Sequence, residues 1–160
     1  MRESAASHGA RPAGGQCAGV MRSSTARKGE IAVHRAILRA LELGCAPSRP
    51  CVEGARYDVI IDAGAGGGLA RVQVKYCDHR PRDTGAYEIS LTRHCGGRDR
   101  RLYRYGPDEI DAVVAFLAAD DALAWLPAPL WAGRTAVTIR TSPARNGQRR
   151  GVHVLEQLRW

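Results

Sequence analysis

Residues 57–77 constrain the fold most, because they contain two strand-like runs separated by a glycine-rich turn. The first run, residues 57–62, is rich in β-branched side chains, and residues 63–68 include four glycines. The second run, residues 69–77, alternates polar and apolar side chains in its middle. Val72 and Val74 should therefore face one side of a strand, and Gln73 and Lys75 the other. We predict a β-hairpin with one buried face.

Lys75 is unusual in its own chain. Of the 24 basic residues, 22 are arginines, and only Lys28 and Lys75 are lysines. An arginine is always charged, whereas a lysine can shift its pKa and exchange a proton. A lysine on the polar face of a strand, two positions after Gln73, is therefore the first place to look for chemistry.

The overall composition suits one compact domain with affinity for polyanions. The chain has 160 residues, 44% of them hydrophobic, and a formal net charge of +8. A positive balance of this size favours nucleic acid as a partner, with an anionic membrane surface as the weaker candidate. A basic protein from an arginine-rich proteome, without any polyanion partner, remains an alternative.

The sequence indicates a cytoplasmic protein that does not enter the membrane. No stretch approaches the roughly 20 consecutive apolar residues that a spanning helix needs, and the N-terminal segment lacks the apolar core of a secretory signal. The five cysteines are odd in number and form no C-x-x-C pair. We therefore expect reduced thiols rather than a disulfide framework.

The chain divides into a tail and a folded domain. Residues 1–24 are rich in Gly, Ala, Ser and Arg and show no hydrophobic period, so we expect a disordered tail, and Met21 is a candidate for the true start. Residues 25–160 form the domain. It should open with a helix at residues 26–43, which Gly44 terminates. Its apolar stripe contains Ile31, Leu38 and Leu41, and Val33 and Ile37 widen it.

Further strands are expected along the rest of the domain. Residues 87–91 and 136–140 have strand patterns. Residues 110–118 are apolar almost throughout and fit a helix or a strand; we favour a strand, which residues 123–126 follow after a turn at Asp120 and Asp121. Residues 151–160 favour a short helix. The order of elements predicts an α/β (α+β) fold.

Four residues could form a site that cuts phosphodiester bonds. Such a reaction needs a metal ion to polarise the phosphate and activate water, and a cation near the developing charge. Carboxylates and backbone carbonyls are the usual Mg²⁺ ligands. The hairpin offers Asp58 on its first strand and Gln73 with Lys75 on its second, and Glu30 lies near the start of the helix. Each also has an ordinary explanation, as a helix-stabilising acid, a strand-end polar group or a solvated lysine.

This ordered set resembles the PD-(D/E)-x-K nuclease superfamily. The strings at residues 28–30, 56–58 and 71–75 look more narrowly like the branch that contains a group I intron homing endonuclease and bacterial relatives. The downstream order is also similar over residues 26–158: Tyr105 precedes residues 107–111, then come Leu126-Pro127 and residues 146–148.

The resemblance implies a restriction-endonuclease-like core, a mixed β-sheet flanked by helices, and an endodeoxyribonuclease that depends on Mg²⁺ or Mn²⁺. It would make Asp58 the central metal ligand, the carbonyl of Val74 a backbone ligand, Glu30 the acid from the helix and Lys75 the catalytic cation. Gln73 departs from the wider superfamily, where an Asp or Glu is usual, although the narrower branch shares this glutamine. The neutral side chain leaves the site short of one negative charge.

Two other functions therefore stay open. One is a DNA-binding module on the same fold whose catalytic site has decayed, and the other is a basic accessory subunit that acts on RNA or in a protein complex. Cutting both strands of a duplex would require two active sites, hence a homodimer or a larger homo-oligomer, unless the enzyme only nicks.

Arginine clusters are candidates for contacts with duplex or branched DNA. One segment interleaves tyrosines with Arg93, Arg98, Arg100, Arg101 and Arg104, a pattern suited to phosphate contacts and stacking. A second cluster surrounds Gln148 and includes Arg149. Arg56 lies close enough to Asp58 in sequence to pair with an acid of the site or with a phosphate. A solvated basic loop is the alternative for the first cluster.

Overall fold

The computed structural model describes residues 24–52, 54–78, 85–94, 102–142 and 153–160. Its centre is a five-stranded sheet in the order β1-β2-β3-β7-β8. The strands of this sheet are β1 (Ala46–Ser48), β2 (Val59–Asp62), β3 (Leu69–Cys77), β7 (Ala112–Leu117) and β8 (Ala122–Pro127). Neighbouring strands are antiparallel except β3 and β7, which run parallel. The sheet is therefore mixed, as the sequence predicts.

The predicted hairpin forms β2 and β3. Val59 pairs with Val72, and Asp62 pairs with Leu69 across the glycine turn. The strand β2 begins one residue after Asp58, although the N–H of Asp58 still donates to the carbonyl of Val72 at 2.9 Å. Beyond this point β3 continues without β2 and pairs only with β7. The edge of β3 next to Asp58 is thus open from Gln73 onward.

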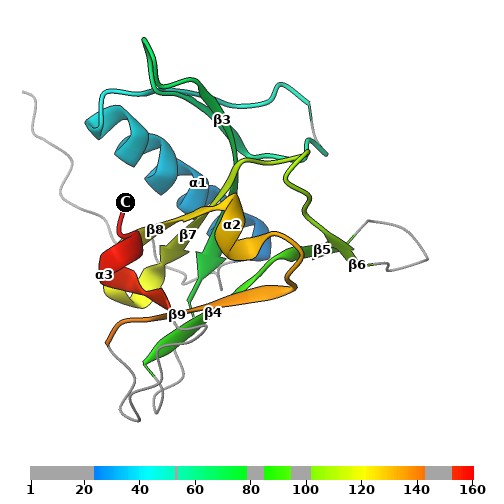
Figure 1. Ribbon diagram of the computed structural model, residues 1–160, viewed down its shortest axis with the longest axis vertical. Coiled ribbons are helices and arrows are strands. Elements are labelled where there is room, and N and C mark those ends of the chain that lie inside the picture. The colour runs from blue at the N-terminus through cyan, green and yellow to red at the C-terminus, as the bar shows by residue number, and fades with distance from the viewer. Residues whose placement is uncertain (1–23, 53, 79–84, 95–101, 143–152) are drawn as a thin grey trace, which may run out of the picture.

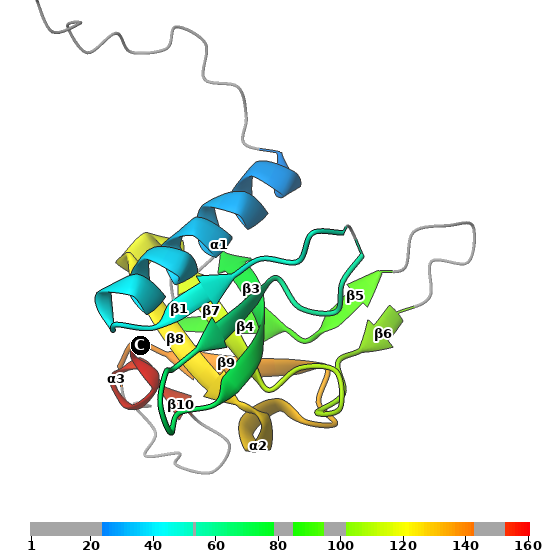
Figure 2. The same cartoon turned by 90° about the horizontal axis from the view of Figure 1, so that it is seen from above.

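The helix α1 (Thr25–Glu42) covers one face of the sheet (Figures 1 and 2). The side chain of Ser24 caps its start by accepting from the N–H of Arg27, and Gly44 leaves the helix with φ +77°. The predicted helix is confirmed, and its predicted buried stripe is correct only in part, since Val33 is buried and Ile37 packs against the core. Ile31, Leu38 and Leu41 are exposed, and the face against the sheet is made mainly of small side chains: Ala32, Val33, Ala36 and Ala40.

A second sheet covers the opposite face of the first (Figure 2). It has the order β10-β9-β4 and contains β4 (Ala86–Ser90), β9 (Ala136–Arg140) and β10 (His153–Val154). The short helices α2 (Ala128–Trp131) and α3 (Leu155–Leu158) pack beside it. All six residues of β7 are buried, because both faces of this strand are covered. Every second residue from Ala112 faces α1, and every second residue from Val113 faces the second sheet.

A small two-stranded ribbon, β5 (Thr92–His94) and β6 (Leu102–Arg104), forms a separate antiparallel pair. In both views it projects from the body on the side away from the C-terminus (Figures 1 and 2). The chain leaves β6 directly into Tyr105, which is buried in the core between the sheets. Residues 105–111 therefore connect the ribbon to β7 of the central sheet.

The sequence predicts the long elements and misses the short ones. The predicted strand at residues 110–118 is β7, the returning strand is β8, and a 3₁₀ turn, η1 (Ala118–Asp120), with Asp121 at φ +45°, connects them. The predicted C-terminal helix shrinks to α3. The elements that the sequence does not indicate are β1, α2, β5, β6 and β10. In the part of the chain that the structure describes, every helix is too short or too polar to cross a membrane.

Candidate active site

Asp58 lies where β2 leaves the edge of β3. One of its carboxylate oxygens, Oδ2, accepts from the N–H of Val74 at 2.8 Å and from Nε2 of Gln73 at 2.5 Å. The N–H and carbonyl of a strand residue point to the same side, so the carbonyl of Val74 also faces the open edge beside Asp58. The hairpin thus places a carboxylate and a main-chain carbonyl at the same open edge.

Gln73 faces this edge from β3. Its amide nitrogen donates to Asp58 and lies 3.5 Å from the carbonyl oxygen of Val74. A glutamate here would place a second anion against the half-buried Asp58, and like charges at such a distance oppose ionisation of the pair. The neutral amide instead hydrogen-bonds the carboxylate and holds its orientation.

Lys75 emerges on the same face as Gln73, two residues further along β3. Its ammonium lies 3.1 Å from the hydroxyl of Tyr105 and 4.8 Å from the centre of that ring. Burial lowers the pKa of Lys75, and the negative charge of Asp58 partly offsets this effect. Burial likewise raises the pKa of Asp58, against the hydrogen bond from Val74 and the positive charge of Lys75. Two opposite charges therefore share a partly desolvated site.

Glu30 approaches from α1. It is exposed, and Arg49 binds both of its carboxylate oxygens at 3.0 Å. The hydrogen bonds from Arg49 lower the pKa of Glu30, so the group stays ionised at neutral pH. Glu30, Arg49 and Asp58 line one pocket of about 320 Å³, together with residues from the segment between β1 and β2. The structure thus brings the helix acid and the strand acid to the same hollow.

The donor atoms around this pocket suit a hard divalent cation. Two carboxylates and the carbonyl of Val74 are oxygen donors of the kind that Mg²⁺ binds, with water completing the shell. Within the described ranges, no three Asp, Glu, His or Cys side chains come close enough to hold a metal by themselves. Glu30 would also have to release Arg49 in order to contact a cation. The donor set fits Mg²⁺ with few protein ligands.

Arg56 makes a protein contact rather than standing free for DNA. Its guanidinium pairs with Glu109 at 3.1 Å, and the other carboxylate oxygen of Glu109 accepts from the N–H of Gly106 at 3.2 Å. Arg71 similarly binds Asp111 with two parallel hydrogen bonds of 3.0 Å. These two pairs fasten the hairpin to the turn that leads into β7.

Two of the predicted DNA-contacting arginines lie on the ribbon. Arg93 in β5 stacks over the ring of Tyr103 at 5.8 Å, and Arg104 in β6 is exposed. Tyr103 and Leu102 are also exposed on this ribbon. The other predicted contacts, Arg98, Arg100, Arg101, Gln148 and Arg149, fall outside the described residues.

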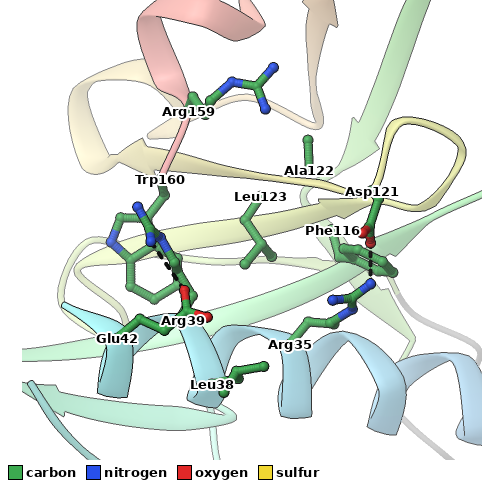
Figure 3. Close-up of a pocket in the computed structure, with 10 residues that line it drawn as sticks. All are labelled: Arg35, Leu38, Arg39, Glu42, Phe116, Asp121, Ala122, Leu123, Arg159 and Trp160. Carbon is green, nitrogen blue, oxygen red and sulfur yellow. Dashed lines mark hydrogen bonds and ion pairs between the residues drawn. The ribbon is translucent and has the colours of Figure 1, made fainter.

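A larger pocket, of about 420 Å³, lies on the other side of α1, against β8 and the C-terminus (Figure 3). Four of its charged side chains pair with one another, Arg35 with Asp121 and Arg39 with Glu42, and Arg159 pairs with Glu156. None of the predicted site residues lines it. The smaller pocket at Asp58 is therefore the better candidate, because chemistry rather than size identifies an active site.

Three neighbours of the site were not predicted as functional residues: Arg49, Tyr105 and Glu109. Arg49 lies between two prolines in a segment without a clear pattern, and nothing in the sequence links it to Glu30. Tyr105 is one of the tyrosines interleaved with the basic segment, where the sequence suggests stacking on nucleic acid, and it is part of the family resemblance; neither pattern indicates a contact with Lys75. Each contacts a site residue that is distant along the chain.

Comparisons with known proteins agree with the resemblance carried by Asp58, Gln73 and Lys75. A sequence profile of the PD-(D/E)XK endonuclease family matches residues 23–159. The solved structure of a bacterial homing endonuclease, I-Ssp6803I, matches with a TM-score of 0.69 and 25% sequence identity, over 85% of this chain and 88% of that chain. No curated protein matches. The chain belongs to the PD-(D/E)XK endonuclease family.

Proposed function

We propose that this endonuclease hydrolyses phosphodiester bonds of DNA with the help of a divalent metal ion, Mg²⁺ or Mn²⁺. The observation that carries the proposal is the arrangement at the open edge of β3. There the carboxylate of Asp58 meets the N–H of Val74, and Lys75 emerges on the face of Gln73. Membership of an endonuclease family and likeness to a homing endonuclease support DNA as the substrate.

In the proposed mechanism, Asp58, the carbonyl of Val74 and Glu30 hold the metal ion. When bound, the ion would polarise the scissile phosphate and lower the pKa of a water molecule. Lys75 places its ammonium where it can orient the attacking water or stabilise the charge that develops on the phosphate. Gln73 keeps the carboxylate of Asp58 in place through its hydrogen bond.

In this mechanism Glu30 binds either Arg49 or the metal ion. Without metal the guanidinium neutralises the carboxylate, as the two 3.0 Å hydrogen bonds indicate. Release of Glu30 toward the metal would leave Arg49 unpaired at the mouth of the pocket. We propose that it then pairs with a DNA phosphate, which an arginine can bind with two hydrogen bonds.

The proposed DNA contacts come from the projecting ribbon and from the basic segments beside it. Arg93 and Arg104 lie on the ribbon, and Arg98, Arg100, Arg101, Gln148 and Arg149 remain proposed contacts from the sequence. Arg56 is better assigned as a brace, because Glu109 holds it. The free thiols of Cys45, Cys51 and Cys77 support the proposed cytoplasmic location, and cleavage of both strands would call for a homo-oligomer.

The alternative is a DNA-binding protein on this fold with a decayed site. Gln73 favours it, because a neutral amide occupies the position where the wider superfamily has an acid. This alternative predicts binding to DNA that weakens with salt and no turnover with any divalent ion.

Incubation with supercoiled plasmid, with and without Mg²⁺ or Mn²⁺, separates the two functions. We expect metal-dependent nicked or linear product from the wild type and none above background from Lys75→Ala. Lys28→Ala is the matched control, because it removes the other lysine of the chain. Lys28 lies near the start of α1 and pairs with Asp78. This variant should cut like the wild type. Equal cutting by Lys75→Ala and the wild type would refute the assignment of Lys75. Binding without product in any metal would favour the decayed site.

A further inference from the structure

Tyr105 is the described residue that hydrogen-bonds the ammonium of Lys75. Its hydroxyl oxygen lies 3.1 Å from Nζ, and the ammonium also lies 4.8 Å from the ring centre. The Tyr105 side chain is only 6% exposed, so the contact forms inside the protein rather than in solvent. Both the hydroxyl and the ring therefore act on a single charged group.

Among the residues that the structure describes, Lys75 has few other ways to fix its position. Its neighbour on β7 is Ala115, whose buried methyl side chain leaves room for the lysine stem but offers no polar group. A lysine side chain has several rotatable bonds and loses much rotamer entropy when it is fixed. A partner at the tip of the side chain is what converts a flexible ammonium into one with a set position.

The turn that follows Tyr105 is fixed by hydrogen bonds and by an ion pair. The N–H groups of Glu109 and Ile110 donate to the carbonyl of Gly106, at 2.9 and 3.1 Å. Glu109 in turn pairs with Arg56, two residues before Asp58. The turn that carries the tyrosine is thus tied to the segment that carries the catalytic carboxylate.

A tyrosine that only filled the core would not need its hydroxyl at this point. Phenylalanine would give the same ring to the apolar cluster that contains Tyr87, Ile110 and Val113. Here the polar end of the ring meets the half-buried ammonium that the proposed chemistry requires. Buried tyrosine hydroxyls normally find a partner, and this one finds Lys75.

We infer that Tyr105 is a positioning residue for the cleavage reaction: its hydroxyl accepts a hydrogen bond from the Lys75 ammonium, and its ring covers that ammonium, so that the charge is held toward Asp58. This role rests on the proposed nuclease function. Tyr105 itself does not touch the reacting phosphate. Tyr105 limits the movement of the Lys75 ammonium, which we propose acts on the phosphate.

Tyr105→Phe tests the role of the hydroxyl while keeping the ring and the core packing. The single-turnover cleavage rate at saturating DNA and Mg²⁺ should fall about ten- to hundredfold, as expected for one hydrogen bond to a charged group. DNA affinity should stay within about twofold, because the hydroxyl acts on Lys75 rather than on DNA. Tyr87→Phe is the matched control, since it removes another buried tyrosine hydroxyl, one that hydrogen-bonds Asp120 rather than Lys75. Wild-type rates in Tyr105→Phe would overturn the inference, while leaving the nuclease function intact.

A measurement without catalysis keeps the two proposals separable. Lysine labelled with ¹³C gives only two side-chain signals in this chain, from Lys28 and Lys75. We expect the Lys75 signal to be more rigid than the Lys28 signal in the wild type and to gain mobility in Tyr105→Phe. If the wild type cuts no DNA, the nuclease proposal fails and this measurement still decides the contact. Equal mobility of both lysines in the wild type would refute the positioning role.

Discussion

At the scale of single residues, the candidate site holds charges in a place that disfavours them. Burial raises the pKa of Asp58 and lowers that of Lys75, so each group is pushed toward its neutral form. Groups whose pKa values are displaced by burial and by a specific charged partner are typical of functional sites. The two half-buried charges should therefore lower the free energy of unfolding, and removing one of them should raise it.

Asp58→Asn should stabilise the metal-free protein by about 1 kcal/mol at neutral pH, roughly 3–5 °C in the unfolding midpoint. The asparagine oxygen can still accept from the N–H of Val74. Because burial raises the folded pKa of Asp58, its carboxyl stabilises the fold below the ordinary aspartate pKa, about 3.9. That stability is lost as pH rises through the raised value. The gain from asparagine should therefore appear only above this window.

Thermal unfolding in a chelator at several pH values measures this effect. Asp62→Asn is the control, because it makes the same change at the other end of β2, where the carboxylate caps the glycine turn by accepting from the N–H of Gly64 at 2.8 Å. It should bring no gain. A lower midpoint for Asp58→Asn than for the wild type at neutral pH would contradict the interpretation of a buried, destabilising charge.

The sequence could indicate Asp58, Gln73 and Lys75, because all three lie on one hairpin whose alternation shows which side chains share a face. It could not indicate Arg49 or Tyr105. Their partners, Glu30 and Lys75, lie about 20 and 30 residues away along the chain, and only the tertiary fold brings them together. The assigned roles of the hairpin residues remain proposals for the experiments above.

At the scale of elements, α1 shows why a periodic pattern can predict a helix and still misplace its buried face. Ile31, Leu38 and Leu41 look like a core stripe, yet all three are exposed. Ala32, Ala36 and Ala40 recur every fourth residue and are completely buried. Small side chains let the helix lie close to β3 and β7, and hydrophobicity alone does not reveal this preference for a close approach.

Ala36→Leu should therefore lower the free energy of unfolding by about 1–3 kcal/mol, because added methyl groups have no space against the sheet. Leu38→Ala removes a larger side chain from the same helix but from its exposed side, and it should change the value by less than about 1 kcal/mol. Denaturant unfolding of both variants compares the two faces. A neutral Ala36→Leu would show that α1 is not closely packed on the sheet.

The strands illustrate a similar limit. The pattern of residues 110–118 was compatible with a helix, and it became a strand because β7 is buried on both faces in the middle of the sheet. The two- and three-residue strands β1, β5, β6 and β10 are too short to show a period. They form because a longer neighbour, or the partner strand of a ribbon, is already in place.

At the scale of the whole molecule, the net charge of +8 and the projecting ribbon together predict that ribbon arginines contact DNA phosphates. Arg104→Ala should weaken binding to different DNA sequences by a similar factor and reduce the slope of log affinity against log salt by about 1. Arg159→Ala is the control, because Arg159 precedes the last residue of the chain and pairs with Glu156, and Figure 1 shows the C-terminus on the side away from the ribbon. Titrations at several salt concentrations measure both. Equal slopes in the wild type and Arg104→Ala would exclude a phosphate contact.

The parallel pairing of β3 with β7 also sets an order of assembly. The hairpin of β2 and β3 can close early, because its partners are near each other along the chain, but Val72 must wait for Ala112. Contacts between distant segments form slowly, since a long loop has to close first. A nascent chain would therefore carry Asp58 and Lys75 for some time without the strand and the tyrosine that complete their surroundings. In the proposed mechanism, cleavage would therefore require synthesis beyond Leu117, well past the residues that we propose do the cutting.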